Sequence, residues 1–190
     1  MKKLIFIGLA AVLAFAPTGA LAALEIITNG GFETGYISPW TTDSFEVGNT
    51  PGYSHSGDYF ADTGYVGNTN GWTAYIYQDL PFTVQPQEVV AAEFWVRQDY
   101  EGRGVNVVYG FYLGENHVGT NIAPILTWQH ITFPKDNITA PFNYVKIELE
   151  FWDTGEPPFN FAGSLDDVSV TVTLSGVEPA SLGRVKALYR

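Results

Sequence analysis

Apolar and polar residues alternate along several segments of this chain, and the pattern predicts β-strands. Segments rich in Val, Ile, Tyr, Phe and Thr are separated by clusters of Gly, Asn, Pro, Asp and Ser. The body of the sequence contains no apolar stripe with the 3.6-residue period and capping residues of a helix. We therefore expect strands over residues 72–84, 88–98, 105–113, 128–133 with 144–152, and 165–174.

Short strands at this spacing, with turn residues between them, are typical of a β-sandwich or a barrel. The sequence has no internal repeat and no low-complexity linker. We therefore predict a single all-β domain.

The alternation also assigns side chains to faces, because successive residues of a strand point to opposite sides. The residues expected to face the core are Ala74, Ile76, Leu80, Val90, Ala92, Phe94, Val96, Val105, Val107, Tyr109, Phe111, Leu113, Val145, Ile147, Leu149 and Phe151. On the opposite, polar side, four strands carry aromatic residues, namely Tyr75 and Tyr77, Trp95, Tyr112 and Trp152. Several aromatic rings on a polar face are unusual for a surface that meets only water.

The two ends of the chain differ from the body. Lys2 and Lys3 precede an uncharged apolar run over 4–15, and Ala20-Leu21-Ala22 has the small-x-small pattern of a cleavage site. This is the pattern of a secretory signal peptide, too short to span a membrane. We predict a signal peptide over 1–22, a domain over 23–177 and a short basic tail over 178–190, with the mature protein secreted or at a bacterial cell surface.

Composition narrows the possible ligands. The chain has no cysteine, so export brings no disulfide framework. Its formal charge is −11, and the predicted domain alone, with 19 acidic and 4 basic residues, carries −15. Such a body repels nucleic acid and anionic lipid, and it suits neutral ligands and divalent cations.

Six short motifs occur in an order that resembles a known family. They are Asn29-Gly30-Gly31-Phe32-Glu33 followed by Trp40, Ser54-His55-Ser56-Gly57-Asp58-Tyr59, Ile76-Tyr77-Gln78-Asp79-Leu80, Ala92-Glu93-Phe94-Trp95-Val96-Arg97, Thr127-Trp128-Gln129, and Leu165-Asp166-Asp167-Val168-Ser169-Val170. Together they resemble the galactose-binding-domain-like jelly rolls, especially carbohydrate-binding modules of the family 4/9/22 type. The resemblance covers residues 24–174 and implies a jelly-roll β-sandwich of two antiparallel sheets.

The resemblance also implies a structural calcium ion where the first and last strands meet. By position, its ligands would be Glu33 and Asp166 or Asp167, with backbone carbonyls around Thr28 and Asp58. Calcium takes six to eight oxygen ligands, which carboxylates and carbonyls supply. The alternative is that Glu33 accepts backbone hydrogen bonds at a turn and that the two aspartates end a loop.

The family binds glycans on a concave sheet, which here would be the face that carries the outward aromatic residues. Sugar rings stack on Trp and Tyr, while charged and amide groups bind the hydroxyls. The residues expected to bind the glycan are Tyr75, Tyr77, Glu93, Trp95, Arg97, Asn106, Tyr112, Glu148, Glu150 and Trp152. Trp40 and Trp72 flank loops and are expected to be packing residues.

Two other functions stay open at this point. Glu148 and Glu150 form a carboxylate pair on one strand face, as in β-sandwich glucanases, but Lys146 stands where that family has its nucleophile. The same fold could also serve a cell-surface assembly protein that contacts a protein partner through its tail. His55, His117 and His130 lie far apart in the sequence, and each is expected to be a surface or hydrogen-bonded histidine.

Overall fold

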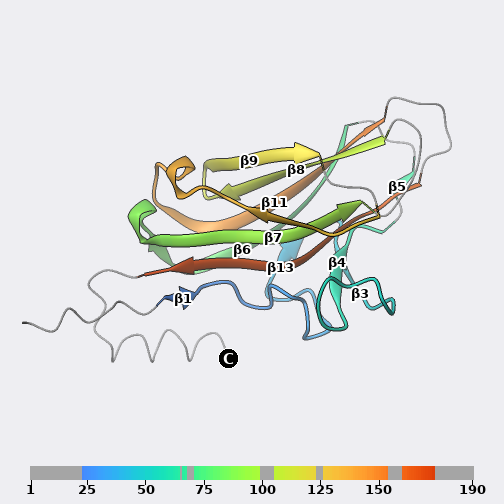
Figure 1. Ribbon diagram of the computed structural model, residues 1–190, viewed down its shortest axis with the longest axis horizontal. Helices are drawn as coiled ribbons and strands as arrows, with labels where there is room; N and C mark the ends of the chain where they lie inside the picture. The colour runs from blue at the N-terminus through green and yellow to red at the C-terminus, as the bar shows by residue number, and fades with distance from the viewer. Residues whose placement is uncertain are drawn as a thin grey trace, which may run out of the picture.

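Two antiparallel β-sheets packed on each other form the body of the protein (Figure 1). The computed structural model describes residues 23–64, 66–67, 71–98, 105–122, 126–153 and 160–173. Sheet A has the order β10-β7-β13-β4-β3, with β1 pairing to β13, and sheet B has the order β2-β6-β11-β8-β9. Strands β12 and β5 form a separate two-stranded ribbon.

The strands of sheet A are β1 (Leu24–Glu25), β3 (Glu46–Gly48), β4 (Phe60–Asp62), β7 (Val89–Gln98), β10 (Gln129–Thr132) and β13 (Gly163–Val172). Those of sheet B are β2 (Thr41–Thr42), β6 (Trp72–Val84), β8 (Val105–Leu113), β9 (Asn116–Ile122) and β11 (Phe142–Asp153). The ribbon consists of β5 (Val66–Gly67) and β12 (Asn160–Phe161). Two single-turn 3₁₀ helices, η1 (Pro86–Glu88) and η2 (Lys135–Asn137), connect strands.

The predicted fold class is confirmed, since the described residues form an all-β sandwich of two antiparallel sheets. Each segment expected to be a strand coincides with β6, β7, β8, β10, β11 or β13. Sequence reasoning missed β9 because its sequence N-H-V-G-T-N-I offers little apolar alternation. Strand β9 is placed by its pairing with β8 and by Val118, which is buried in the core.

A cluster of aromatic rings joins the two sheets across the core. Phe94 of β7 lies 5.4 Å from Phe111 of β8 and 5.6 Å from Phe133, measured between ring centroids. Phe111 and Phe133 stack at 4.5 Å with an interplanar angle of 10°. Full burial of Phe94 and Phe111 removes large apolar surfaces from water and so fixes how sheet A sits on sheet B.

The predicted core-facing residues with described side chains are buried, with one exception. Val90 is 53% exposed, and its neighbour Val89 is buried instead. The reason is a register irregularity, because Val172 pairs with Val89 while Thr171 pairs with Ala91, which leaves Val90 without a partner. The expectation for Trp40 is met, since its ring is buried and its indole N–H donates to the Asn29 carbonyl at 3.0 Å.

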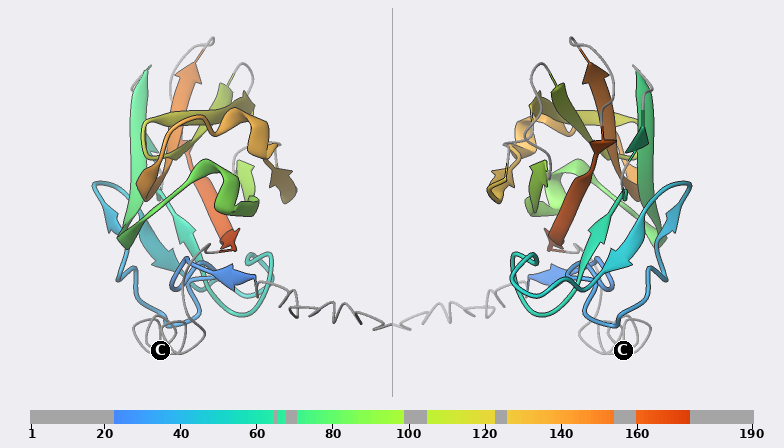
Figure 2. Two further views of the ribbon diagram at one scale, coloured as in Figure 1. Left: turned by 90° about the vertical axis from the view of Figure 1, so that its left-hand side faces the viewer. Right: turned by 90° about the vertical axis from the view of Figure 1, so that its right-hand side faces the viewer.

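The loop between β1 and β2, called the first loop, closes one end of the sandwich through a tight contact with β13. Val168 donates its backbone N–H to the Gly30 carbonyl at 3.0 Å. A Cβ at position 30 would stand 1.9 Å from the Val168 carbonyl oxygen, so only glycine fits there. The loop between β3 and β4 lies on the same side as β1 (Figure 2).

The predicted signal peptide over 1–22 and the basic tail over 178–190 lie outside the described residues. The predicted domain boundaries therefore stay predictions. Among the residues that the structure describes, no helix is long and apolar enough to cross a membrane.

Candidate functional site

The outer face of sheet B carries a row of rings beside a row of charged groups. On β11, the odd-numbered residues 145–151 are buried, so the even-numbered residues project outward. On β6, the outward residues at the same level include Tyr75, Tyr77 and Asp79. The face therefore brings together six residues of the predicted site with described side chains: Tyr75, Tyr77, Tyr112, Glu148, Glu150 and Trp152.

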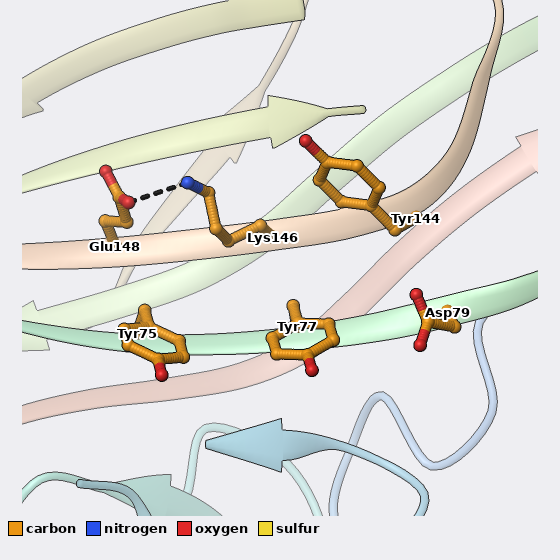
Figure 3. A pocket seen from close by; sticks show the side chains of 6 residues that line it. All are labelled: Tyr75, Tyr77, Asp79, Tyr144, Lys146 and Glu148. Atoms are coloured by element: carbon orange, nitrogen blue, oxygen red, sulfur yellow. Dashed lines mark hydrogen bonds and ion pairs between the residues drawn. The ribbon is translucent and has the colours of Figure 1, made fainter. Parts of the chain in front are cut away.

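An open hollow of about 360 Å³ lies between β6 and β11 (Figure 3). Its lining residues are Tyr75, Tyr77, Asp79, Tyr144, Lys146 and Glu148. The rings of Tyr75 and Tyr77 lie side by side along β6, with their centroids 6.3 Å apart and an interplanar angle of 29°. The Tyr144 hydroxyl donates to Glu115 at 2.8 Å, so its ring is held at one end of the hollow.

Lys146 and Glu148 form the polar side of this hollow. The Lys146 ammonium donates to Glu148 Oε1 at 2.7 Å and lies 4.3 Å from the centre of the Tyr112 ring. Burial raises the pKa of Tyr112 to about 12, with a further contribution from its hydrogen bond to Glu148. The Glu148 carboxylate is thus held from two sides, as an oriented hydrogen-bond acceptor.

The Tyr112 ring is already covered within the protein. Lys146 of β11 lies on one side of Tyr112, and His117 of β9 stacks on it at 4.8 Å and 17°. These two residues come from the strands on either side of β8, so they contact the ring from opposite directions. Tyr112 therefore offers no free face for stacking, in contrast to Tyr75 and Trp152, which are 36% and 44% exposed.

The expectation that Trp95 shares this face is wrong. Trp95 lies on β7 of sheet A, as do Glu93 and Arg97, so these three residues project from the opposite side of the sandwich. Alternation separates core from surface, but it does not say which of two sheets a strand joins. The side chain of Asn106 lies outside the described residues, although its backbone pairs with Trp152.

Both faces of the Trp95 indole are covered by histidines. His55 stacks on it at 3.6 Å and 15°, and His130 stacks at 4.8 Å and 12°. His130 comes from β10 on one side of β7, and His55 from the loop above β13 on the other. His130 Nε2 also lies 3.0 Å from Glu93 Oε2, so the carboxylate of Glu93, another predicted glycan-binding residue, contacts a side chain of the protein itself.

Arg97 is buried rather than exposed, which corrects its predicted outward position at a free surface. Its guanidinium lies 4.5 Å from the ring centre of Tyr53 and 5.6 Å from that of Trp128. The Trp128 indole N–H donates to the Tyr53 carbonyl at 2.8 Å. The loop between β3 and β4 thus folds over the outer face of sheet A and contacts the aromatic residues there.

Two carboxylates predicted as metal ligands, those of Asp166 and Asp167, lie beside Gly31, whereas Glu33 brings only its Cγ there and its carboxylate lies against Gly57. A Cβ at Gly31 would stand 3.2 Å from Asp167 Oδ1, 3.9 Å from Asp166 Oδ1 and 3.7 Å from Glu33 Cγ. Asp166 is fully buried and accepts backbone N–H bonds from His55, Ser56 and Asp167. Burial raises the pKa of Asp166 to about 6. The oxygens of Asp166 and Asp167 beside Gly31 are of the donor type that calcium takes.

At the other two predicted ligand positions, the backbones of Thr28 and Asp58 form hydrogen bonds with side chains. The Thr28 carbonyl accepts a bond from Gln78 Nε2 at 2.8 Å, and the Asp58 N–H donates to Glu33 at 3.1 Å. Glu33 also accepts from the Tyr59 N–H at 3.0 Å. Glu33 therefore does accept backbone hydrogen bonds at a turn, which was the alternative to its role as a metal ligand.

Sequence reasoning missed His55 as a member of this cluster. His55 Nδ1 lies 2.7 Å from Asp167 Oδ2, and ligand atoms of His55, Asp166 and Asp167 all lie within 4.8 Å of one another. The available signal was that the His55-Ser56-Gly57 motif and the Asp166-Asp167 motif belong to one family pattern. Nothing in their spacing of more than a hundred residues indicated contact.

A family model described as a carbohydrate binding domain matches residues 24–134, which include β6 to β10 and end before β11. Comparison with curated protein sequences gives no significant match.

Among the solved structures that match this chain, two show the shared fold with a TM-score above 0.5. The carbohydrate-binding module TmCBM61, solved in complex with β-1,4-galactotriose, is 20% identical with a TM-score of 0.54, and the match covers 77% of this chain and 97% of that one. The K1 cleaved adhesin domain of Lys-gingipain from Porphyromonas gingivalis W83 is 16% identical with a TM-score of 0.55. That second match covers 82% of this chain and 99% of the adhesin domain.

The two outward tryptophans should differ in their effect on stability. We expect Trp95→Ala to lower the free energy of unfolding by about 2 kcal/mol, because it empties the gap between two imidazoles. Trp152→Ala should cost less than about 1 kcal/mol, since an exposed ring loses little on truncation. Urea unfolding of both variants measures the difference. Equal losses would contradict the stacked and open environments described for these rings.

Asp166 should make the metal-free protein more stable in acid than near neutrality. Its folded-state pKa of about 6 exceeds the ordinary value of 3.8, so folding favours the protonated form. This stabilising contribution is fully present below about pH 3.8 and is lost as the pH rises through about 6. Chemical unfolding in EDTA across this range should show that slope, and Asp166→Asn should remove it. An unchanged slope in the variant would assign the titration to another group.

Proposed function

This chain belongs to the carbohydrate-binding domain family, and we propose that it binds a neutral glycan on the outer face of sheet B without catalysing a reaction. The observation that carries the proposal is the hollow between β6 and β11, with tyrosine rings on one strand and charged groups on the other. Sugar rings present C–H faces that stack on aromatic side chains, and their hydroxyls bind carboxylates and amines.

Sheet B is preferred over sheet A because its rings are available. Trp95 is stacked between two histidines, and Trp128 is bonded to the loop that covers sheet A. Among the described residues, Tyr75 is 36% exposed and Tyr77 is half-buried, and their rings contact each other. We therefore place ligand contact at Tyr75, Tyr77, Glu148, Glu150 and Trp152, and remove Glu93, Trp95 and Arg97 from this site.

A neutral ligand fits the charge of the protein. The predicted domain carries −15, and the face itself holds Asp79, Glu115, Glu148 and Glu150 against Lys146. An anionic glycan would meet repulsion from this field. β-1,4-Galactan, whose trisaccharide is bound by TmCBM61, is one neutral polymer to test first.

The hydrogen bonds that hold Glu148 favour binding over glycoside hydrolysis. Hydrolysis by paired carboxylates needs one group free to act as an acid and the other free to attack or to activate water. Glu148 is held by Lys146 at 2.7 Å and by the Tyr112 hydroxyl. This arrangement suits an acceptor for sugar hydroxyls.

We also propose that calcium stabilises the fold where the first loop meets β13. Asp166 and Asp167 present carboxylate oxygens beside Gly31, Glu33 lies close by in the first loop, and carboxylate oxygens are of the type that calcium prefers. A bound cation would offset the charge of the buried Asp166 and tie the first loop to the last strand. This proposal is independent of the glycan site on the other sheet.

Export completes the proposed role. The pattern over 1–22 favours secretion, so the binding domain would meet polysaccharides outside the cell. The alternative of an assembly protein relies on the tail over 178–190. No described residue favours that alternative, so it becomes an outcome of the experiment below.

Loss of the β6 tyrosines should abolish glycan binding while the fold is kept. We expect Tyr75→Ala and Tyr77→Ala each to weaken binding at least about tenfold, since each removes one stacking ring. The measurement is an array of neutral polysaccharides, followed by titration calorimetry on β-1,4-galactan or the polymer retained. Tyr36→Ala is the matched control, because this loop tyrosine is 74% exposed and lies outside the hollow.

Absence of binding to every neutral polymer would refute the proposed function. Binding that survives both β6 variants would move the site to another surface. If full-length protein self-associates, and protein truncated before residue 178 is monomeric, the assembly role gains support instead.

Calcium should raise the melting temperature, and EDTA should lower it. A ligand that binds only the folded state adds about 2.7 kcal/mol at a hundredfold excess over its dissociation constant. Glu33→Gln should lose most of this response, whereas Glu46→Gln, at an exposed carboxylate of β3, should keep it. Identical melting in EDTA and in millimolar calcium would show that hydrogen bonds alone hold this end of the sandwich.

A further inference from the structure

We propose that the glycan is a linear chain that lies in the hollow over β6 and β11, parallel to these strands, with a remote contact at Trp152. The inference rests on the proposed glycan-binding function and adds the direction and the minimum length of the ligand. It follows from the register of the two strands and from which rings are open.

The pairing of β6 with β11 sets the contacts in successive rows. Tyr144 pairs with Asp79, Lys146 with Tyr77, and Glu148 with Tyr75. The rings therefore stand along β6 and the charged groups along β11, and the hollow extends over these three rows (Figure 3). A chain that follows the strands meets a stacking surface on one side and hydrogen-bonding groups on the other at each step.

Across the strands, the same face offers no second open ring among the described residues. The row that contains Tyr77 and Lys146 continues to Tyr112 and then to His117, which are stacked on each other. The next row continues from Glu148 to Gly110, and the Tyr112 ring reaches back over Gly110, where a Cβ would stand 3.0 Å from it. A chain that crossed the sheet would leave the open rings after β6.

Trp152 lies beyond the hollow on the same face of sheet B. It projects from the same side of β11 as Lys146 and Glu148 and is 44% exposed. Six positions separate it from Lys146, which is about 20 Å at a rise of about 3.3 Å per residue. Glu150 and Thr73 form the row between, where sugar hydroxyls can bond. A disaccharide covers only the tyrosine pair, and a longer chain reaches Trp152.

The test is the dependence of affinity on chain length in wild-type protein and in Trp152→Ala. Linear β-1,4-linked galacto-, gluco- and xylo-oligosaccharides, from disaccharide to hexasaccharide, are titrated by calorimetry. In the series that binds, affinity should rise with length until the chain reaches Trp152. Trp152→Ala should weaken the hexasaccharide roughly tenfold and leave the disaccharide unchanged. Tyr77→Ala should weaken every length.

Two further variants keep the outcome decisive. His117→Ala should weaken the hexasaccharide less than Tyr77→Ala does, and Tyr36→Ala should have no effect. An equal loss at every length in Trp152→Ala, or a loss in His117→Ala that matches Tyr77→Ala, overturns the lengthwise arrangement and leaves glycan binding intact. If no oligosaccharide and no neutral polymer binds, the proposed function fails and this inference fails with it. Melting temperatures of the variants separate lost contacts from lost folding.

Discussion

The burial of alternate residues on β11 is the constraint that joins the core to the surface in this protein. Val145, Ile147, Leu149 and Phe151 are fully buried, and their neighbours therefore project to the opposite side. A slip of one residue would place Lys146 and Glu148 in the core, where an unpaired charge is costly. The same apolar residues that hold sheet B on sheet A thus fix which charged groups line the hollow, and at what spacing.

The sequence was sufficient for the fold class, for most strands and for the inner and outer side chains of each strand. It was insufficient for the site, because alternation does not say which strands are neighbours. Strands β7 and β11 both carry an outward tryptophan, yet Trp95 and Trp152 lie on opposite sheets. Strand order comes from long-range packing such as that of Phe94 on Phe111, which local pattern does not encode.

Loop contacts were the second part beyond the reach of sequence reasoning. The resemblance to a family indicated Glu33, Asp166 and Asp167. The structure brings Asp166 and Asp167 together beside Gly31, whereas the Glu33 carboxylate lies against Gly57. The resemblance gave no role to His55, which contacts Asp167 from a loop far away in sequence and also stacks on Trp95. One histidine therefore links the carboxylate cluster to the outer face of sheet A, and it removes Trp95 from the set of free rings.

The two outer faces differ in how their aromatic surface is used. On sheet A, Trp95 stacks with histidines, and Tyr53 and Trp128 lie against the Arg97 guanidinium, although Tyr53 is still 40% exposed. On sheet B, Tyr75 and Trp152 keep much of their ring surface in water, where it adds little to folding. Apolar surface left exposed in this way remains available to a ligand, and a sugar that stacks on it removes that surface from water.

Since β11 is paired on both edges, the charged groups beside these rings are ordered before a ligand arrives. Less conformational entropy is then lost on binding, which favours recognition by an open face that encloses its ligand only in part.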